Sequence, residues 1–422
     1  MDQAKQQNSP QSSRGEEKPL WPAVGSAGLA TFSVVTTEML PVGLVTPIAT
    51  DLQASIGNAG LMISVPALVA AVFAPVVTIV AGGQDRRRIL VALLVLLTIA
   101  NLMSAFASTM DWMLAARIVV GVCMGGIWTI AGGLAPRFVP QQSVGLATAI
   151  IFGGVSAASV LGVPAGAIIG DFAGWRVAFG ATAAFSALVL IMNLRALPPL
   201  PVSRPTAFSQ FSDQVRQRPV QLGLVVTLLF VAGHFMAYTF VRPLLQTMSG
   251  IEAEWIGVLL FAYGAAGIFG NFLVGAIAVR RIEHTLTVIA VALATTIFGF
   301  AFVGTTPAGG AMILILWGIA YGGVSVALQT WMMKAAPTAI EVGTSLFVAT
   351  FNIGIALGSF IGGRVVDYFG LHSNMLLATS LPAVGLFFSL VIRSYSLRPA
   401  GMMNGHPNRT VGADPSTSEP PA

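Results

Sequence analysis

The sequence has few charged residues. Only 9% of its 422 residues are Asp, Glu, Lys or Arg, whereas an average soluble domain has about 25%. Hydrophobic residues make up 55% of the chain. This composition excludes an ordinary soluble domain and indicates a protein that crosses a membrane many times.

Cysteine and lysine are also scarce. Cys123 is the only cysteine, which excludes a disulfide framework and a cysteine-rich metal site. No phosphate-binding loop of the Gly-Lys-Ser/Thr type exists, because no lysine follows a glycine; the lysines are Lys5, Lys18 and Lys334. ATP is therefore not the expected energy source, and no cofactor or metal is expected.

Histidines are too scattered for catalysis inside the membrane. An intramembrane enzyme needs paired carboxylates, a histidine cluster or a serine beside a base. The histidines lie far apart, at positions 234, 284, 372 and 406. We therefore expect a protein that is not an enzyme.

Long apolar stretches dominate what is present. A helix of about 20 apolar residues crosses a bilayer. Twelve stretches meet this criterion, at 22–47, 58–80, 89–108, 112–135, 143–170, 175–197, 220–246, 255–279, 285–304, 309–334, 342–367 and 372–393. The predicted fold class is an all-α membrane protein with twelve transmembrane helices.

Basic residues lie on alternate loops of this predicted topology. The outer loops carry only two arginines, Arg176 and Arg364, against six acidic residues: Asp51, Asp111, Asp171, Glu252, Glu254 and Asp367. The remaining segments hold almost all other Lys and Arg, so the positive-inside rule places both termini in the cytoplasm. We expect a multi-pass protein of the cell inner (plasma) membrane, whose net charge of +5 requires no nucleic-acid partner.

The longest polar interruption divides the chain into two halves. It lies between the sixth and seventh predicted spans. We expect a cytoplasmic tail at 1–20, a six-helix half at 21–197, a cytoplasmic linker at 198–219, a second six-helix half at 220–394 and a disordered cytoplasmic tail at 395–422.

Internal repeats support this division. Gly121–Gly126 matches Gly318–Gly323 at an offset of 197, and Asp171–Gly174 matches Asp367–Gly370 at an offset of 196. The arginine pairs that begin at Arg86 and at Arg280 are 194 residues apart. Duplicated halves of this kind hold a substrate at their interface near the bilayer midplane and rock about it.

Several motifs resemble those of a known family. Segment 81–88 occupies the place of the loop signature between helices two and three of the major facilitator superfamily, 117–126 resembles its helix-four motif, and 154–170 resembles its helix-five antiporter signature. The chain thus resembles this superfamily, and within it the drug:proton antiporter-1 group. More narrowly, the chain is similar to the sugar and purine ribonucleoside efflux branch of that group, at segments 37–44, 125–128, 174–176 and 238–243.

Two positions depart from the family pattern. Arg88 stands where the loop signature has a later glycine, and Val279 stands where the second half would have an aspartate.

The resemblance implies a monomeric antiporter that exports a small organic solute by alternating access. Protons are the favoured coupling ion, because a sodium site would require clustered carboxylates and only one acid lies inside a span. The expected partners are the substrate, protons and membrane lipids. A purine ribonucleoside, a sugar or a related compound is one substrate class; an antibiotic such as an amphenicol is the alternative, and uptake by symport is less favoured.

Glu38 is that single embedded acid. An ionised carboxylate at a helix centre costs about 2.5 to 3.5 kcal/mol, so such residues face a cavity, find a partner or hold a proton. Arg117 and Arg242 lie at a similar predicted depth, in the outer third. Three interpretations remain open: Glu38 has a coupling or substrate-linked function, it forms a permanent ion pair with an arginine, or it faces water.

His234 and Arg117 are the other candidates for proton coupling. His234 is the only histidine within a predicted span. Its side chain titrates near physiological pH, so it is suited to a proton relay, although a packing role is equally compatible with the sequence. For Arg117 the family resemblance favours coupling; a plain ion-pair partner for Glu38 or Asp111 is the alternative.

Aromatic and amide residues inside the spans are candidates for substrate binding. Rings suit stacking on a planar solute, and amides suit hydrogen bonds to hydroxyls or ring nitrogens. The predicted set is Trp128, Tyr238, Arg242, Asn271, Gln329 and Asn352. The amides are equally suited to joining membrane helices, Arg242 can also extend toward the interface, and packing or interface roles are predicted for Trp21, Trp317 and Trp331.

Gating is predicted at two places. Asp85 and Arg86 lie in the loop signature, where charge contacts hold or release the cytoplasmic gate; topogenic charge alone is the alternative. Gly162, Pro164 and Gly166 form a ladder of small residues in helix five. This ladder predicts a close, bendable crossing of that helix against its repeat partner.

Overall fold

A computed structural model describes residues 19–80, 84–131, 133–201, 209–337 and 339–396. Most of both predicted tails, and residues 202–208 of the predicted linker, lie outside this part of the chain. Within the described ranges every regular element is a helix. The all-α prediction is therefore confirmed.

The first half contains six membrane-crossing helices, of which the fifth is interrupted. A π-helical segment, Ala158–Gly162, separates α6 from α7. The elements are α1 (Trp21–Asp51), α2 (Ile56–Val80), α3 (Arg86–Ala105), α4 (Met110–Ala131), the short α5 (Ala135–Phe138), α6 (Val144–Ala157), α7 (Val163–Ala173) and α8 (Trp175–Ala196).

The second half follows α9 (Ser209–Val215), a short helix inside the predicted linker. The backbone leaves helical geometry at Arg281 and at Gly370, so α12 and α15 are each two membrane helices joined at a sharp bend. The elements are α10 (Arg218–Tyr238), α11 (Val241–Pro243), α12 (Ala253–Val303), α13 (Pro307–Gly322), α14 (Val324–Ala335) and α15 (Ile340–Ser396).

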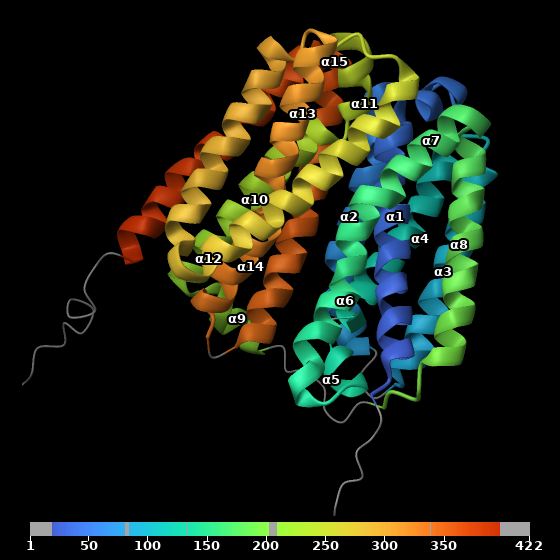
Figure 1. Ribbon diagram of the computed structural model, residues 1–422, viewed down its shortest axis with the longest axis vertical. Helices are drawn as coiled ribbons and strands as arrows, with labels where there is room; N and C mark the ends of the chain where they lie inside the picture. Colours follow the sequence, from blue (N-terminus) through green and yellow to red (C-terminus); the bar gives the residue numbers. More distant parts are fainter. Residues whose placement is uncertain (1–18, 81–83, 132, 202–208, 338, 397–422) are drawn as a thin grey trace, which may run out of the picture.

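Twelve crossings result from these elements. Eleven stretches are long and apolar enough to span a membrane, and the longest of them, Val342–Ser394, contains the bend at Gly370. Figure 1 shows α1–α8 and α10–α15 as two neighbouring bundles, which meet through α2 against α15 and α7 against α12. We call the upper end in Figure 1 the α11 end and the lower end the α5 end.

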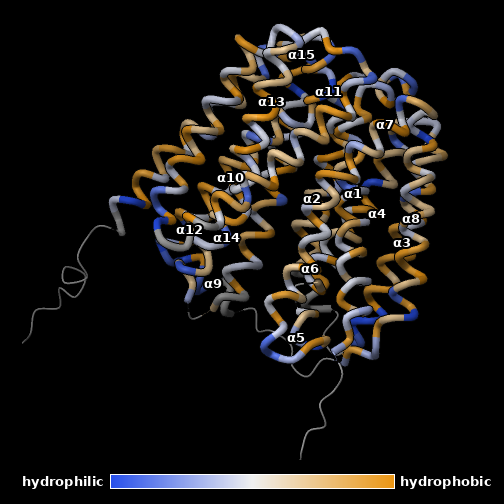
Figure 2. The backbone as a smooth tube through the Cα atoms, viewed as in Figure 1, coloured by the Kyte–Doolittle hydropathy of each residue, from blue (hydrophilic) through white to orange (hydrophobic). Residues whose placement is uncertain are grey.

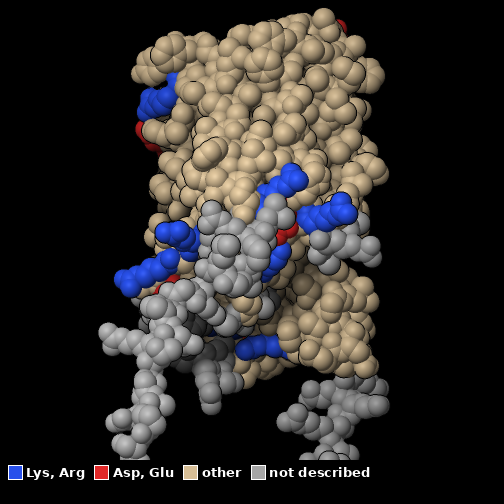
Figure 3. Space-filling model, turned by 90° about the vertical axis from the view of Figure 1, so that its left-hand side faces the viewer, with Lys and Arg blue, Asp and Glu red and all other residues tan. Residues whose placement is uncertain are grey.

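The surface of the bundle is apolar along the helices. Figure 2 shows hydrophobic residues over most of their length and hydrophilic residues gathered toward the ends. Phe269 and Phe272 on α12 are among the large side chains that are exposed. On the face shown in Figure 3, Lys and Arg gather mainly in the lower half, toward the α5 end. This surface matches a bundle whose helices face lipid.

The two halves repeat the same close helix crossing. A Cβ at Gly121 of α4 would lie 2.5 Å from the carbonyl oxygen of Pro66 on α2. A Cβ at Gly318 of α13 would lie 2.5 Å from the carbonyl oxygen of Tyr263 on α12. Only glycine allows this backbone approach, which explains why these glycines recur in both halves.

Candidate functional site

Glu38 lies inside α1 and is buried, with 4% of its surface exposed. Among the described residues none forms an ion pair or hydrogen bond with its carboxylate. The permanent ion pair with Arg117 or Arg242, considered from the sequence, is therefore absent. Both arginines use their terminal nitrogens on other atoms.

Arg117 of α4 is fully buried and bonds to the backbone next to Glu38. Its Nη1 donates to the carbonyl oxygen of Thr37 at 2.9 Å, and its Nη2 donates to Ser104 Oγ at 2.7 Å. The Thr37 carbonyl lacks its usual helical donor, because the residue four positions later is Pro41, which has no N–H. Arg117 thus replaces a backbone hydrogen bond that the proline removes.

A hydrogen-bond network extends from Thr37 into the first half. Asn101 Nδ2 donates to Thr37 Oγ1 at 2.9 Å and to Ser186 Oγ at 3.3 Å, and Ser186 Oγ lies 2.9 Å from Ser33 Oγ. These side chains are buried. They fix the segment of α1 that carries Glu38 while leaving the carboxylate itself without a hydrogen bond.

Arg242 of α11 is buried and connects the two halves. It forms an ion pair with Asp171 at the end of α7, and its Nη1 donates to the carbonyl oxygen of Gly43 on α1 at 2.5 Å. The Gly43 carbonyl is free because Pro47 stands four residues later. Arg242 therefore neither extends to the membrane surface nor offers its terminal nitrogens to a substrate in this conformation.

Aromatic side chains gather around His234 in the second half. The His234 ring lies flat on Tyr321, with centroids 3.3 Å apart and an interplanar angle of 7°, and it stacks on Tyr238 at 4.9 Å. Tyr238 stacks on Tyr263 at 4.7 Å. We call these four near-parallel rings the aromatic column; α10, α12 and α13 supply them.

Trp317 stands edge-on beside this column. Its ring lies at 72° to His234 and at 87° to Tyr238. Three buried polar atoms of this group have no hydrogen-bond partner in the described part of the chain: His234 Nδ1, Trp317 Nε1 and Tyr321 Oη. The group faces the other half, because the Glu38 carboxylate is close enough to Tyr321 for the two to interact electrostatically.

The structure unites only part of the predicted substrate set. Tyr238 belongs to the aromatic column, whereas half-buried Trp128 packs on Phe152 within the first half, with centroids 5.9 Å apart. Asn352 is buried and donates to a carbonyl oxygen of its own helix, that of Val348, at 2.9 Å. Of the two other amides, Asn271 is half-buried and Gln329 is exposed.

Three residues of the group escaped the sequence prediction. Trp317 was assigned to packing, and Tyr263 and Tyr321 were not considered. One signal was available for Tyr321: it lies in the repeated glycine motif, where the first half has Met124. A hydroxyl inside an otherwise apolar repeat requires a partner, which distinguishes it from its counterpart.

Asp85 joins the start of α3 to the segment after α8 at the α5 end. Its carboxylate accepts from the backbone N–H of Arg87 at 2.9 Å, which caps α3, and from the N–H of Leu200 at 2.8 Å. The N–H of Arg86 donates to the Leu200 carbonyl at 3.0 Å. These bonds attach the segment after α8 to the start of α3.

The glycine ladder of helix five faces a different helix from the one predicted. A Cβ at Gly162 would lie 2.2 Å from Thr36 Oγ1, and a Cβ at Gly166 would lie 1.9 Å from Leu40 Cδ1. The ladder therefore packs on α1, and its predicted contact with the repeat partner is wrong. Pro164 follows the π-helical segment, and its carbonyl lies near Gly257 of α12.

Further contacts hold the α11 end together. Asp367 of α15 accepts from the N–H of Gly57 at 2.8 Å and from Ser55 Oγ at 2.6 Å, so it caps α2 from the opposite half. Asp367 is the repeat counterpart of Asp171, which pairs with Arg242. Both repeated aspartates thus link the halves at this end.

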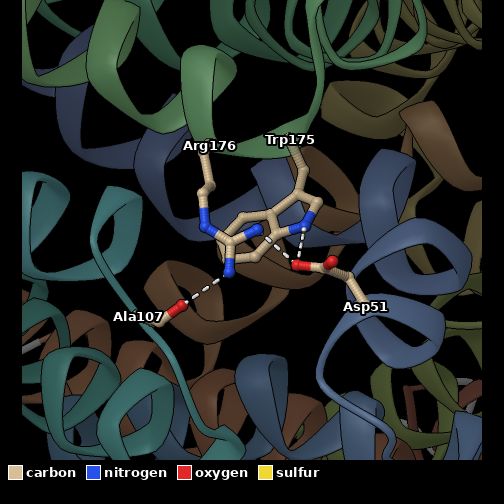
Figure 4. Close-up of polar contacts among 4 residues, drawn as sticks. All are labelled: Asp51, Ala107, Trp175 and Arg176. Carbon is tan, nitrogen blue, oxygen red and sulfur yellow. Dashed lines mark hydrogen bonds and ion pairs between the residues drawn. The ribbon is translucent and has the colours of Figure 1, made fainter.

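Arg176 connects the helix ends of the first half. Figure 4 shows its guanidinium over the Trp175 ring, paired with Asp51 and donating to the Ala107 carbonyl at 3.0 Å. Trp175 Nε1 also donates to Asp51, at 3.2 Å. The Gly-Trp-Arg motif therefore joins the ends of α1, α3 and α8 and lies apart from Glu38.

Comparison with known proteins identifies the family. A model described as Major Facilitator Superfamily matches residues 27–358. Two proteins named purine ribonucleoside efflux pump NepI, from Salmonella paratyphi A and Salmonella typhimurium, are each 32% identical to this chain over 368 residues, covering 87% of it and 92% of each relative.

Solved structures share the fold at low sequence identity. A bacterial homologue of the human lysosomal transporter Spinster, in an inward-facing and unoccupied conformation, matches with a TM-score of 0.73 and 16% identity, covering 89% of this chain and 98% of that chain. The nucleoside transporter NupG matches with a TM-score of 0.73 and 14% identity, and the match covers 88% of this chain and 99% of NupG. The chain therefore belongs to the major facilitator superfamily, whose members among these relatives are transporters and not enzymes.

Proposed function

We propose that this protein is a proton-coupled antiporter that exports a purine ribonucleoside or a related solute across the inner membrane. The substrate class is suggested by the relatives, which are named purine ribonucleoside efflux pumps. One observation carries the coupling: Glu38 is buried, and no described residue forms an ion pair with it.

An unpaired carboxylate in this position suits exchange. Burying an isolated ionised carboxylate is costly, so Glu38 holds a proton unless a donor reaches it. A solute that donates hydroxyl or ring N–H groups to the carboxylate supports its ionised form and releases the proton. Proton and solute then occupy Glu38 alternately, which is the requirement for antiport.

Arg117 and His234 are assigned supporting roles in coupling. Arg117 places a positive charge on the backbone beside Glu38 through Thr37, which favours release of the proton once water enters. His234 lies in the ring stack that continues to Tyr321, next to Glu38. This position suits a group that passes protons between the halves.

The charges and contacts at the two ends support the proposed orientation. The loops rich in Arg and Lys lie at the α5 end, which we assign to the cytoplasm. Arg242 and Asp367 join the halves at the α11 end, so this conformation is closed toward the outside. Asp85 and Arg86 are assigned to the cytoplasmic gate, and the π-helical segment before Pro164 gives helix five its bend.

Transport by purified protein in proteoliposomes tests the proposal. Under an imposed pH gradient, the wild type is expected to accumulate radiolabelled adenosine or guanosine in exchange for protons. Glu38→Gln is expected to lose gradient-driven accumulation and to retain solute exchange in the absence of a gradient. Full gradient-driven transport by Glu38→Gln would contradict the coupling role.

A matched control and a substrate panel complete the experiment. Glu254→Gln makes the same change at an exposed position on α12 and is expected to leave transport unchanged. An amphenicol and a neutral sugar are assayed in parallel. Transport of either one in place of the nucleosides would assign the protein to the alternative substrate class.

A further inference from the structure

The three unpartnered polar atoms beside the aromatic column require an explanation. His234 and Trp317 are buried, and the polar atoms of their rings, together with Tyr321 Oη, meet no donor or acceptor among the described residues. A polar group buried in a membrane bundle without a hydrogen bond costs several kcal/mol. Three such atoms in one contact group indicate that another molecule supplies their partners.

The rings define the shape of that molecule. Tyr321, His234, Tyr238 and Tyr263 stack in order, with successive interplanar angles of 7°, 21° and 25°. Tyr321 is the end member on the side of Glu38 and is only half-buried. When the Tyr321 side chain rotates aside, a flat heteroaromatic ring can take its place and stack on the exposed face of His234.

The edge of Trp317 defines the polar requirement. Its ring is nearly perpendicular to the column, at 87° to Tyr238 and 81° to Tyr263. Indole Nε1–H can only donate, so its partner must be an acceptor. A base with an acceptor atom on its edge satisfies this requirement, and a saturated sugar ring offers no face for stacking.

We propose that the aromatic column is the recognition site for the planar base of the exported solute: the base stacks on His234 in place of the Tyr321 ring, and an acceptor atom on its edge accepts from Trp317 Nε1. This inference rests on the proposed function and names the residues that select the solute. The sugar hydroxyls of the solute then point toward Glu38.

Equilibrium binding to detergent-purified protein tests the site separately from transport. Radiolabelled adenosine is the probe, and adenine, ribose and uridine are the competitors. Adenine is expected to compete and ribose is not. Trp317→Phe keeps a buried ring but removes the N–H, so adenosine affinity is expected to fall about 3- to 10-fold. His234→Leu removes the stacking face and is expected to lower affinity on the order of tenfold.

The chain offers a matched control. Trp331 Nε1 already donates to the Pro219 carbonyl, at 3.1 Å. Trp331→Phe therefore makes the same substitution in the same bundle and is expected to leave adenosine affinity unchanged. Thermal unfolding of each variant is measured alongside, so that a loss of binding is compared only between folded proteins.

Two patterns of failure are distinguishable. Wild-type affinity in both Trp317→Phe and His234→Leu, or competition by ribose equal to that by adenine, would overturn the base site while leaving nucleoside export intact. No binding of any purine ribonucleoside by the wild type would overturn the proposed substrate class and the base site with it.

Discussion

Arg242 donates to the carbonyl oxygen of Gly43 across the boundary between the two halves, at 2.5 Å. Gly43 precedes Pro47 by four residues, so its carbonyl has no helical donor. The same relation recurs within the first half, where Arg117 bonds to Thr37 four residues before Pro41. Two prolines in α1 thus expose two carbonyls, and each is bound by a buried arginine.

Replacing Arg117 is expected to destabilise the protein. In Arg117→Met the carbonyl of Thr37 and the hydroxyl of Ser104 lose a charged donor, which costs about 1–3 kcal/mol. Thermal unfolding in detergent measures this loss. In a Pro41→Ala background the loss is expected to be smaller, because the restored N–H at position 41 gives the Thr37 carbonyl a helical partner. Equal losses in both backgrounds would argue against the carbonyl bond.

Removing Arg242 is expected to open the α11 end. Arg242→Met removes the ion pair with Asp171 and the hydrogen bond to the Gly43 carbonyl. The partly buried Asp171 carboxylate then has lost its charged partner. Spin labels at Asp111 and Glu254, which are exposed and lie on opposite halves at this end, report the change in separation after Cys123 is replaced by serine.

The expected result is a longer-distance population in Arg242→Met than in the parent protein. Arg364→Met serves as the control, because Arg364 is exposed and lies over Phe360, with its guanidinium carbon 5.5 Å from the ring centroid. Identical distance distributions in the Arg242 variant and the control would show that the arginine does not hold the halves together.

Adding a methyl group at Gly57 is expected to have the same effect by a steric route. A Cβ at Gly57 would lie 2.1 Å from the carbonyl oxygen of Gly363 in the opposite half. Gly57→Ala is therefore expected to disfavour the closed α11 end in the same spin-label measurement and to slow adenosine exchange. Gly180→Ala, where a Cβ meets no atom within 4 Å, is the control. A closed end in Gly57→Ala would contradict this prediction.

The repeated glycines at the helix ends are expected to be required for backbone conformation alone. Gly174 has φ +88° and Gly370 has φ +80°, and an added Cβ meets no atom within 4 Å at either position. Alanine at each position is expected to cost about 1–3 kcal/mol, because this region of φ and ψ is nearly restricted to glycine. Lower melting temperatures in both variants, with no decrease in Gly153→Ala inside helix α6, would confirm the strain.

The membrane crossings were predictable because they depend on local composition. A helix that faces lipid must be apolar over its whole length, so the twelve crossings appear as runs in the sequence. The bends at Arg281 and Gly370, each between two adjacent crossings, fall where the runs are interrupted. The repeated motifs likewise indicated the duplication, because Gly121 and Gly318 allow the equivalent close helix contact in each half.

The partners of the buried polar residues were not predictable in the same way. Depth along the helices placed Glu38, Arg117 and Arg242 together, but depth does not specify which face of a helix meets which neighbour. The structure pairs Arg242 with Asp171, and none of the described residues forms an ion pair with Glu38. The predicted neighbour of the glycine ladder was wrong for the same reason. The spacing of the small residues predicts a close crossing, but only the packing shows that the neighbouring helix is α1.

The sequence by itself determined the number of crossings, the duplication and the presence of a costly acid at Glu38, because hydrophobicity and cost of burial are properties of single residues and runs. Only the tertiary structure decided that the arginines bind carbonyls left free by prolines, and that Tyr321, which stacks on His234, lies close enough to Glu38 for an electrostatic interaction. Such pairings join residues from different helices and different halves. They depend on how the helices rotate and pack against one another, which no local pattern encodes.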